Sequence, residues 1–170
     1  MKSVLISIQP KWCELIASGK KTVEVRKTKP NLATPFKCYI YQTRKTWVYN
    51  IYSRIADWQG KVIGEFVCND IECFTTDYRV NGIQINKMVS ESCVGIVELM
   101  AYESKHHCLY GWHISDLVIY DEPRDLKNYQ QCFKCEFRQS CVEGAECYDA
   151  EGWYALSRPP QSWCYVEVLR

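Results

Sequence analysis

The first 26 residues predict a strand, a helix and a second strand in close succession, and this pattern constrains the fold more than any other feature. Residues 4–8 form a short apolar run rich in β-branched side chains, which is typical of a strand. Pro10 suits the first turn of a helix, and Gly19 accepts the left-handed conformation that ends one. Residues 22–26 then alternate polar and apolar side chains, which predicts a strand with two distinct faces.

The rest of the chain continues with short strands and few helices. Further strands are expected over residues 38–41, 62–68, 112–120 and 163–169, and a second helix over 89–102. Strands and helices do not alternate regularly, so a parallel sheet with crossover helices is not expected. The pattern favours an α+β fold built on a small mixed β-barrel of about five to six strands with two or more flanking helices. A chain of 170 residues fits one domain, residues 1–170.

The positive charges gather in the first part of the chain. Residues 1–46 hold ten Lys or Arg against two Glu, a balance of +8, whereas residues 47–170 carry −7. The near-neutral total therefore hides a basic segment that could focus a phosphate-bearing ligand onto one face. The alternative is a solvated surface with no partner.

No apolar run approaches the roughly 20 residues that a membrane helix needs. Gln9, Pro10 and Lys11 interrupt the short apolar stretch at the start, which is unlike a signal peptide. We therefore expect a cytoplasmic protein.

Eleven cysteines are many for a chain of this length, and in a reducing compartment clustered thiols favour metal binding over disulfides. An insertion rich in cysteine is expected at about 128–152, near the C-terminus. Its close first pair and looser second pair predict a structural zinc site, while reduced thiols or a disulfide formed on oxidation remain alternatives. The expected ligands, spaced C-x2-C-x5-C-x5-C, are Cys132, Cys135, Cys141 and Cys147.

Residues 19–26 match the pattern Gly-x-Lys-x-x-Glu-x-Arg. This segment resembles the motif of the ASCH domain (activating-signal-cointegrator homology), a branch of the PUA-like superfamily. Residues 110–114 and 158–163 also resemble small bacterial and phage members of that family. The resemblance implies a PUA-like β-barrel with a cleft beside the helix, and a role in RNA binding or RNA-linked chemistry.

The motif supplies the main candidate site residues. Lys21 can contact phosphate as a point charge, or act as a base if burial lowers its pKa. Glu24 and Arg26 lie two apart on one strand, so they share a face and could orient a base edge and a phosphate, or neutralise each other. Aromatic residues such as Trp163 could stack on bases or belong to the core. The expected ligand-binding residues are Lys21, Glu24, Arg26, Tyr41, Trp112 and Arg158.

Three functions stay open at this point. The leading interpretation is a module that binds RNA or a nucleotide-like ligand, helped by a loop at 43–60 that mixes basic and aromatic residues. The second is a ribonuclease or an acylated-cytidine amidohydrolase, with Lys21 reactive and Glu24 or Glu65 as its catalytic carboxylate. The amidohydrolase branch has threonine where this chain has Glu24. The third is a protein-interaction domain that uses the cysteine-rich segment.

Overall fold

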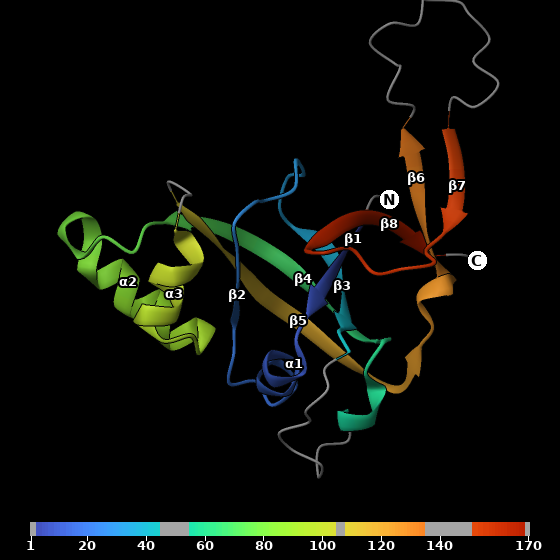
Figure 1. Ribbon diagram of the computed structural model, residues 1–170, viewed down its shortest axis with the longest axis horizontal. Coiled ribbons are helices and arrows are strands. Elements are labelled where there is room, and N and C mark those ends of the chain that lie inside the picture. The colour runs from blue at the N-terminus through green and yellow to red at the C-terminus, as the bar shows by residue number, and fades with distance from the viewer. Residues whose placement is uncertain (1–2, 45–54, 105–107, 135–150, 169–170) are drawn as a thin grey trace, which may run out of the picture.

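The computed structural model describes residues 3–44, 55–104, 108–134 and 151–168 (Figure 1). Its α+β architecture confirms the expected fold class. The described strands number eight instead of five or six, because two further strands flank the cysteine-rich segment. The helices are α1 (Pro10–Ala17), α2 (Tyr78–Ser92) and α3 (Ile96–Glu103), with short 3-10 turns η1 (Ala56–Trp58) and η2 (Leu126–Asn128). The strands are β1 (Ser3–Ile8), β2 (Val23–Arg26), β3 (Phe36–Gln42), β4 (Lys61–Phe74), β5 (Leu109–Arg124), β6 (Tyr129–Lys134), β7 (Glu151–Ala155) and β8 (Trp163–Val168).

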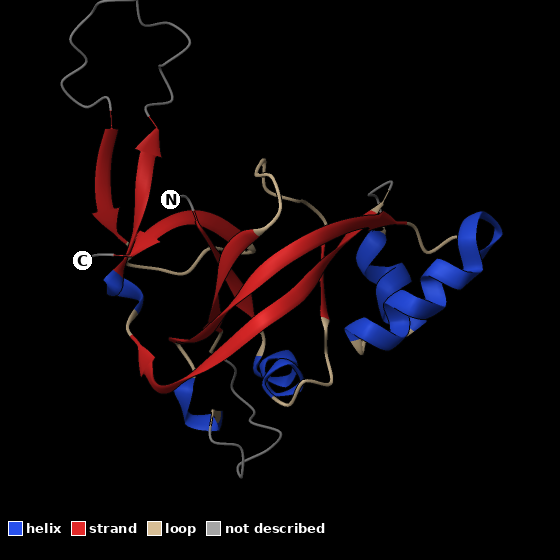
Figure 2. Cartoon of the chain, turned by 180° about the vertical axis from the view of Figure 1, so that it is seen from behind, coloured by secondary structure: helices blue, strands red, loops and turns tan. Residues whose placement is uncertain are grey.

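The strands form one mixed sheet in the order β2-β5-β4-β3-β1-β8-β6-β7. Strands β1 and β3 run parallel, and every other neighbouring pair is antiparallel. The sheet curls, with α2 and α3 at one end and the β6–β7 hairpin at the other (Figure 2). The curl brings β2 near β1, although the described backbone pairs β2 with β5. A side chain closes this gap, since Arg26 Nη2 donates to the carbonyl oxygen of Ser7 at 2.6 Å.

Strand β1 lies at the centre of the molecule, and all six of its residues are buried. Val4, Ile6 and Ile8 join the largest core cluster, while Leu5 joins a second cluster on the opposite side of the strand. This division follows from the pleat, because successive side chains point to opposite faces. A strand covered on both faces has no need for polar alternation, which explains its apolar sequence.

Helix α1 forms as the sequence predicts. Pro10 occupies its first turn, and Cys13 and Ile16 are buried against the sheet. Gly19 follows with a φ of +72°, a left-handed conformation that glycine adopts without strain. The backbone N–H of Lys21 then donates to the carbonyl oxygen of Leu15 at 3.0 Å. This tight turn places the lysine of the motif directly before β2.

The single helix expected over residues 89–102 is wrong, because this region belongs to two helices. Helix α2 begins earlier, where the Asp77 side chain accepts from the backbone N–H of Arg79. It ends at Ser92. The next residue, Cys93, turns the chain with a φ of 55°, and α3 starts after Gly95. The Glu91 carbonyl oxygen accepts from the backbone N–H of Thr22 at 2.9 Å, which joins the end of α2 to the start of β2.

The β6–β7 hairpin extends from the sheet, and its two strands precede and follow residues 135–150 in the chain (Figure 1). Only Tyr129 and Gln130 of β6 pair with β8, so the hairpin is attached at its base. Cys132 lies on β6, while Cys135, Cys141 and Cys147 lie outside the described residues. Zinc binding therefore stays a prediction, as do the roles of residues 45–54 in the expected aromatic loop. None of the helices described has the length and apolarity to cross a membrane.

Candidate functional site

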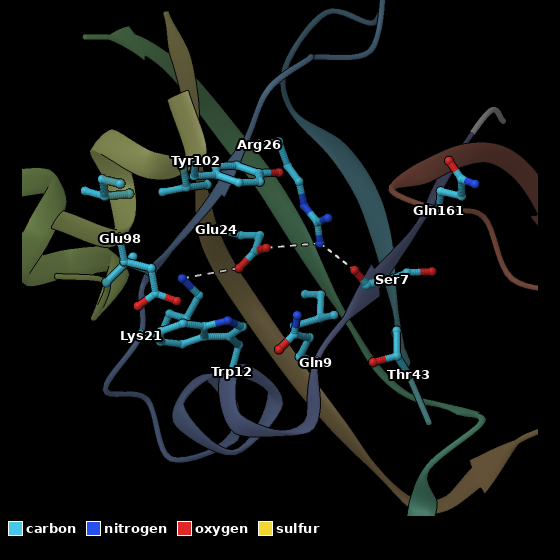
Figure 3. Close-up of a pocket in the computed structure, with 14 residues that line it drawn as sticks. Ser7, Gln9, Trp12, Lys21, Glu24, Arg26, Thr43, Glu98, Tyr102 and Gln161 are labelled. Carbon is cyan, nitrogen blue, oxygen red and sulfur yellow. Dashed lines mark hydrogen bonds and ion pairs between the residues drawn. The ribbon is translucent and has the colours of Figure 1, made fainter. Parts of the chain in front are cut away.

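A pocket of about 390 Å³ opens at the gap between β1 and β2 (Figure 3). We call it the motif pocket, because all three charged residues of the motif line it. Helix α1 forms its base and α3 one side, and residues that follow β3 and precede β8 complete the rim. Its lining consists of Ser7, Ile8, Gln9, Trp12, Lys21, Glu24, Val25, Arg26, Thr43, Val94, Glu98, Leu99, Tyr102 and Gln161.

Lys21, Glu24 and Arg26 form a buried charged trio in this pocket. Glu24 lies between the two cations, with Oε2 at 3.2 Å from Lys21 Nζ and Oε1 at 3.0 Å from Arg26 Nη2. The three residues are only 2%, 6% and 8% exposed, respectively. Burial makes an unpaired charge costly, so the carboxylate offsets much of the penalty of the two cations. One positive charge of the trio remains in excess at the buried end of the pocket, where it favours an electronegative ligand atom, while the exposed Glu98 carboxylate brings the formal charge of the whole lining to zero.

The Lys21 ammonium lines the pocket, and one of its three N–H groups has no accepting oxygen among the described residues. It donates to the carbonyl oxygen of Ser92 at 2.7 Å and contacts Glu24. Its Nζ also lies 5.1 Å from the centroid of the Trp12 ring. An ammonium has three N–H groups, and the described residues provide hydrogen-bonding oxygens for two of them. A ligand oxygen could accept from the third.

Arg26 carries a second unused donor. Its Nε is buried and has no hydrogen-bond partner among the residues that the structure describes. An unsatisfied buried donor costs about 1–3 kcal/mol, so such groups in native proteins usually contact a ligand or an ordered water. The guanidinium otherwise contacts Glu24 and Ser7 through Nη2. Arg26 therefore joins β2 to β1, and its Nε, with less than 1 Å² of exposed surface, is enclosed by the residues around it.

The sequence does not single out two aromatic residues of the pocket. Trp12 lies in the first turn of α1, the helix that leads into the motif, but outside the motif itself. Tyr102 lies on α3, 36% exposed, and no local pattern marks it. Burial raises the pKa of the Tyr102 phenol, an effect that the nearby Arg26 charge partly offsets. The phenol therefore stays protonated at neutral pH and can donate a hydrogen bond.

The other expected ligand-binding residues lie elsewhere. Trp112, expected among the ligand-binding residues, has no exposed surface and packs against Phe36 and Trp163, which favours the core alternative. Its size and apolar ring place it in the core. Tyr41 and Arg158 line a second hollow beside the motif pocket. The structure thus brings together Lys21, Glu24 and Arg26 but not the other three.

Glu65 does not serve the motif pocket. It accepts from Lys37 Nζ at 2.6 Å and from the Tyr120 hydroxyl at 2.6 Å, and it is absent from the pocket lining. The expectation that it acts with Lys21 is therefore wrong. Among the described ranges, no three His, Cys, Asp or Glu side chains gather in a way that could hold a metal ion.

Comparison with known proteins identifies the family and the fold. The family model described as "ASCH domain" matches residues 6–151, most of the chain. A crystal structure of ASCH from Zymomonas mobilis superimposes with a TM-score of 0.61 at 21% identity, covering 99% of this chain and 87% of that one.

Two variants of the same bacterial protein give similar results. A serine-to-alanine variant has a TM-score of 0.60 at 21% identity, covering 99% of this chain and 88% of that chain. A tyrosine-to-phenylalanine variant has a TM-score of 0.57 at 21% identity, with coverage of 100% and 91%. No curated protein matches the sequence. At this identity the neighbours establish the fold alone.

Proposed function

Because the chain belongs to the ASCH domain family, we propose that it is an RNA-binding module whose motif pocket holds one nucleotide or a nucleotide-like small molecule. The observation that carries the proposal is the buried trio of Lys21, Glu24 and Arg26. The trio itself carries one excess positive charge, and in the part of the chain described one Lys21 N–H has no accepting oxygen and the buried Arg26 Nε has no hydrogen-bond partner. Buried polar groups nearly always have hydrogen-bond partners, so donors without one favour a ligand or an ordered water beside them.

The size of the motif pocket supports a single nucleotide as its occupant. Ligand pockets range from about 300 to 1,000 Å³, so a pocket of about 390 Å³ suits a small ligand. Sequence-reading proteins commonly hold an unpaired RNA base in this way, with aromatic rings beside it and hydrogen bonds to its edges. Trp12 and Tyr102 provide the rings, and Lys21 and Arg26 provide donors for carbonyl or phosphate oxygens.

Removal of the Lys21 charge tests this function. We expect Lys21→Met to weaken binding of a labelled single-stranded RNA about tenfold or more, since a hydrogen bond to a charged group contributes about 1.5–3 kcal/mol. The Glu24–Arg26 pair remains neutral in this variant, so the fold should survive, which a circular dichroism melt would verify. Lys20→Met is the matched control, because Lys20 is exposed and lies outside the pocket lining. Equal binding by both variants would refute the role of the pocket.

A hydrolase is the second candidate, favoured by the 3.2 Å contact between Lys21 Nζ and the Glu24 carboxylate. An amine and a carboxylate in contact are suited to proton transfer. The same samples should therefore be analysed for RNA fragments and for deacylation of an acylated cytidine. Turnover by the wild type that disappears in Lys21→Arg would support the enzyme. Salt-dependent binding by both proteins without products would support the binding module instead.

A further inference from the structure

A second hollow of about 650 Å³ lies next to the motif pocket, and we call it the basic hollow. It is bounded by the end of β3, the start of β4, the η2 turn and the segment after β7. Tyr41, Leu126 and Leu156 give it an apolar part. Its charged lining consists of Arg44, Lys61, Asp125, Lys127 and Arg158.

The charges of the basic hollow are unbalanced. Four cations face one carboxylate, and Asp125 contacts Lys61 and, at 3.9 Å, Lys127. Arg44 and Arg158 are exposed and have no carboxylate within ion-pair distance in the described part of the chain. Exposed guanidinium groups without a carboxylate partner suit phosphate, which they bind with paired N–H donors.

The Arg44 side chain lies against the backbone of Gly60. A Cβ on Gly60 would lie 2.6 Å from Arg44 Nε, so a side chain at this position would displace the guanidinium from its place. Gly60 also has a φ of +82°, a conformation that L-residues rarely adopt. The guanidinium therefore lies across the Gly60 backbone at the edge of the basic hollow.

The basic hollow and the motif pocket adjoin each other. Thr43 lines both, and the segment after β7 passes from Arg158 in the hollow to Gln161 in the pocket. Ser7 fixes this segment with two hydrogen bonds. Its Oγ donates to the carbonyl oxygen of Pro160 at 2.7 Å, and its backbone N–H donates to the carbonyl oxygen of Ser162 at 2.9 Å. The two cavities therefore share a wall whose backbone is attached to the central strand.

We propose that the basic hollow binds the phosphates of the nucleotides that flank the one in the motif pocket, so that the protein holds a short single-stranded RNA segment. This inference rests on the proposed function of the motif pocket. A nucleotide inserted into the pocket must be unpaired, and its neighbours must leave past Thr43 or over α3. The side that passes Thr43 carries the excess positive charge, whereas Glu98 lies on the α3 side.

The double variant Arg44→Gln/Arg158→Gln tests the inference with two probes, a labelled RNA of about six nucleotides and cytidine 5′-monophosphate. The variant should weaken binding of the oligonucleotide about tenfold and leave the mononucleotide unchanged. The slope of log Kd against log salt should fall by about 1.4, because each phosphate contact with a single strand contributes about 0.7. Lys29→Gln/Arg79→Gln removes two charges from exposed residues outside both linings and should change neither result.

The outcomes separate the two proposals. If the mononucleotide binds but the oligonucleotide binds no more tightly, or is insensitive to the double variant, the role of the basic hollow is refuted while the motif pocket stands. If neither probe binds, the proposed function fails and the inference with it. If an acidic peptide of the same charge competes with the oligonucleotide, the basic hollow binds anions in general. That result would refute RNA as the partner.

Discussion

Glu24 forms ion pairs with both buried cations, Lys21 and Arg26. Its charge therefore contributes more to the stability of the fold than the charge of an exposed residue at the rim of the pocket. Glu24→Gln would leave Lys21 and Arg26 close together without their carboxylate. Removing one member of a buried charged group costs about 3–5 kcal/mol. We expect the free energy of unfolding to fall by about 3 kcal/mol, measured by urea denaturation.

Glu98→Gln is the matched control for this prediction. Glu98 lines the same pocket but is exposed on α3, and substitutions at such sites usually change stability by no more than about 0.5 kcal/mol. A Glu24→Gln protein as stable as this control would contradict the structural role of the trio.

At the residue scale, the sequence predicts the contacts made within one strand and misses those made across the fold. Glu24 and Arg26 are two apart on a strand, so their shared face follows from the pleat alone. The Ser92 carbonyl that binds Lys21 lies 71 residues away, and Tyr102 is further still. Their positions depend on how α2 and α3 dock beside β2, which no local pattern specifies.

At the scale of the element, the turn between α1 and β2 determines where the motif lies. Gly19 has a φ of +72°, and a Cβ there would meet no atom within 4 Å. Gly19→Ala should therefore lower stability by about 1 kcal/mol through backbone strain alone. Thermal unfolding followed by circular dichroism would measure the effect.

Gly19→Asn separates backbone strain from the effect of adding a side chain, because asparagine tolerates the left-handed region better than alanine. The asparagine variant should be more stable than the alanine variant. If both are as stable as the wild type, the left-handed turn is not required for the position of Lys21.

The sequence predicts the elements that carry strong local signals. The strand–helix–strand start is correct, because Pro10 and Gly19 set both ends of α1. The single helix over 89–102 is wrong, because no proline marks the break at Cys93 and the left-handed residue is not a glycine. The sequence does not predict strands β6 and β7, because neither has a clear alternation of polar and apolar residues. They form by pairing with each other.

At the scale of the whole molecule, several carboxylates make stability depend on pH. Burial raises the pKa of Glu65, but hydrogen bonds from Lys37 and Tyr120 outweigh it and bring the pKa below its ordinary value of 4.5. The pKa of Glu72 is lowered in the same way, where hydrogen bonds from Gln84 and Lys87 outweigh burial. These carboxylates take up protons more readily in the unfolded chain than in the native one.

Their contribution to stability is therefore complete above about pH 5 and declines as the pH falls through 4.5 toward the native pKa values. We expect urea denaturation between about pH 6 and pH 3 to show this decline. Glu65→Gln should be less stable at the upper end and should lose less stability on acidification. A variant with the same pH dependence as the wild type would show that Glu65 does not contribute.

The gap between β1 and β2 differs from the rest of the sheet, because side chains and not backbone pairing span it. Neighbouring strands of the sheet are joined by backbone hydrogen bonds, which any sequence of suitable pattern can make. Strands β1 and β2 are not neighbours in the sheet, and the Arg26 side chain joins them where the pocket lies. Side chains that line the pocket outside the buried trio can therefore be exchanged during evolution while the sheet retains its pairing. One scaffold could in this way acquire pockets of different chemistry without a new fold.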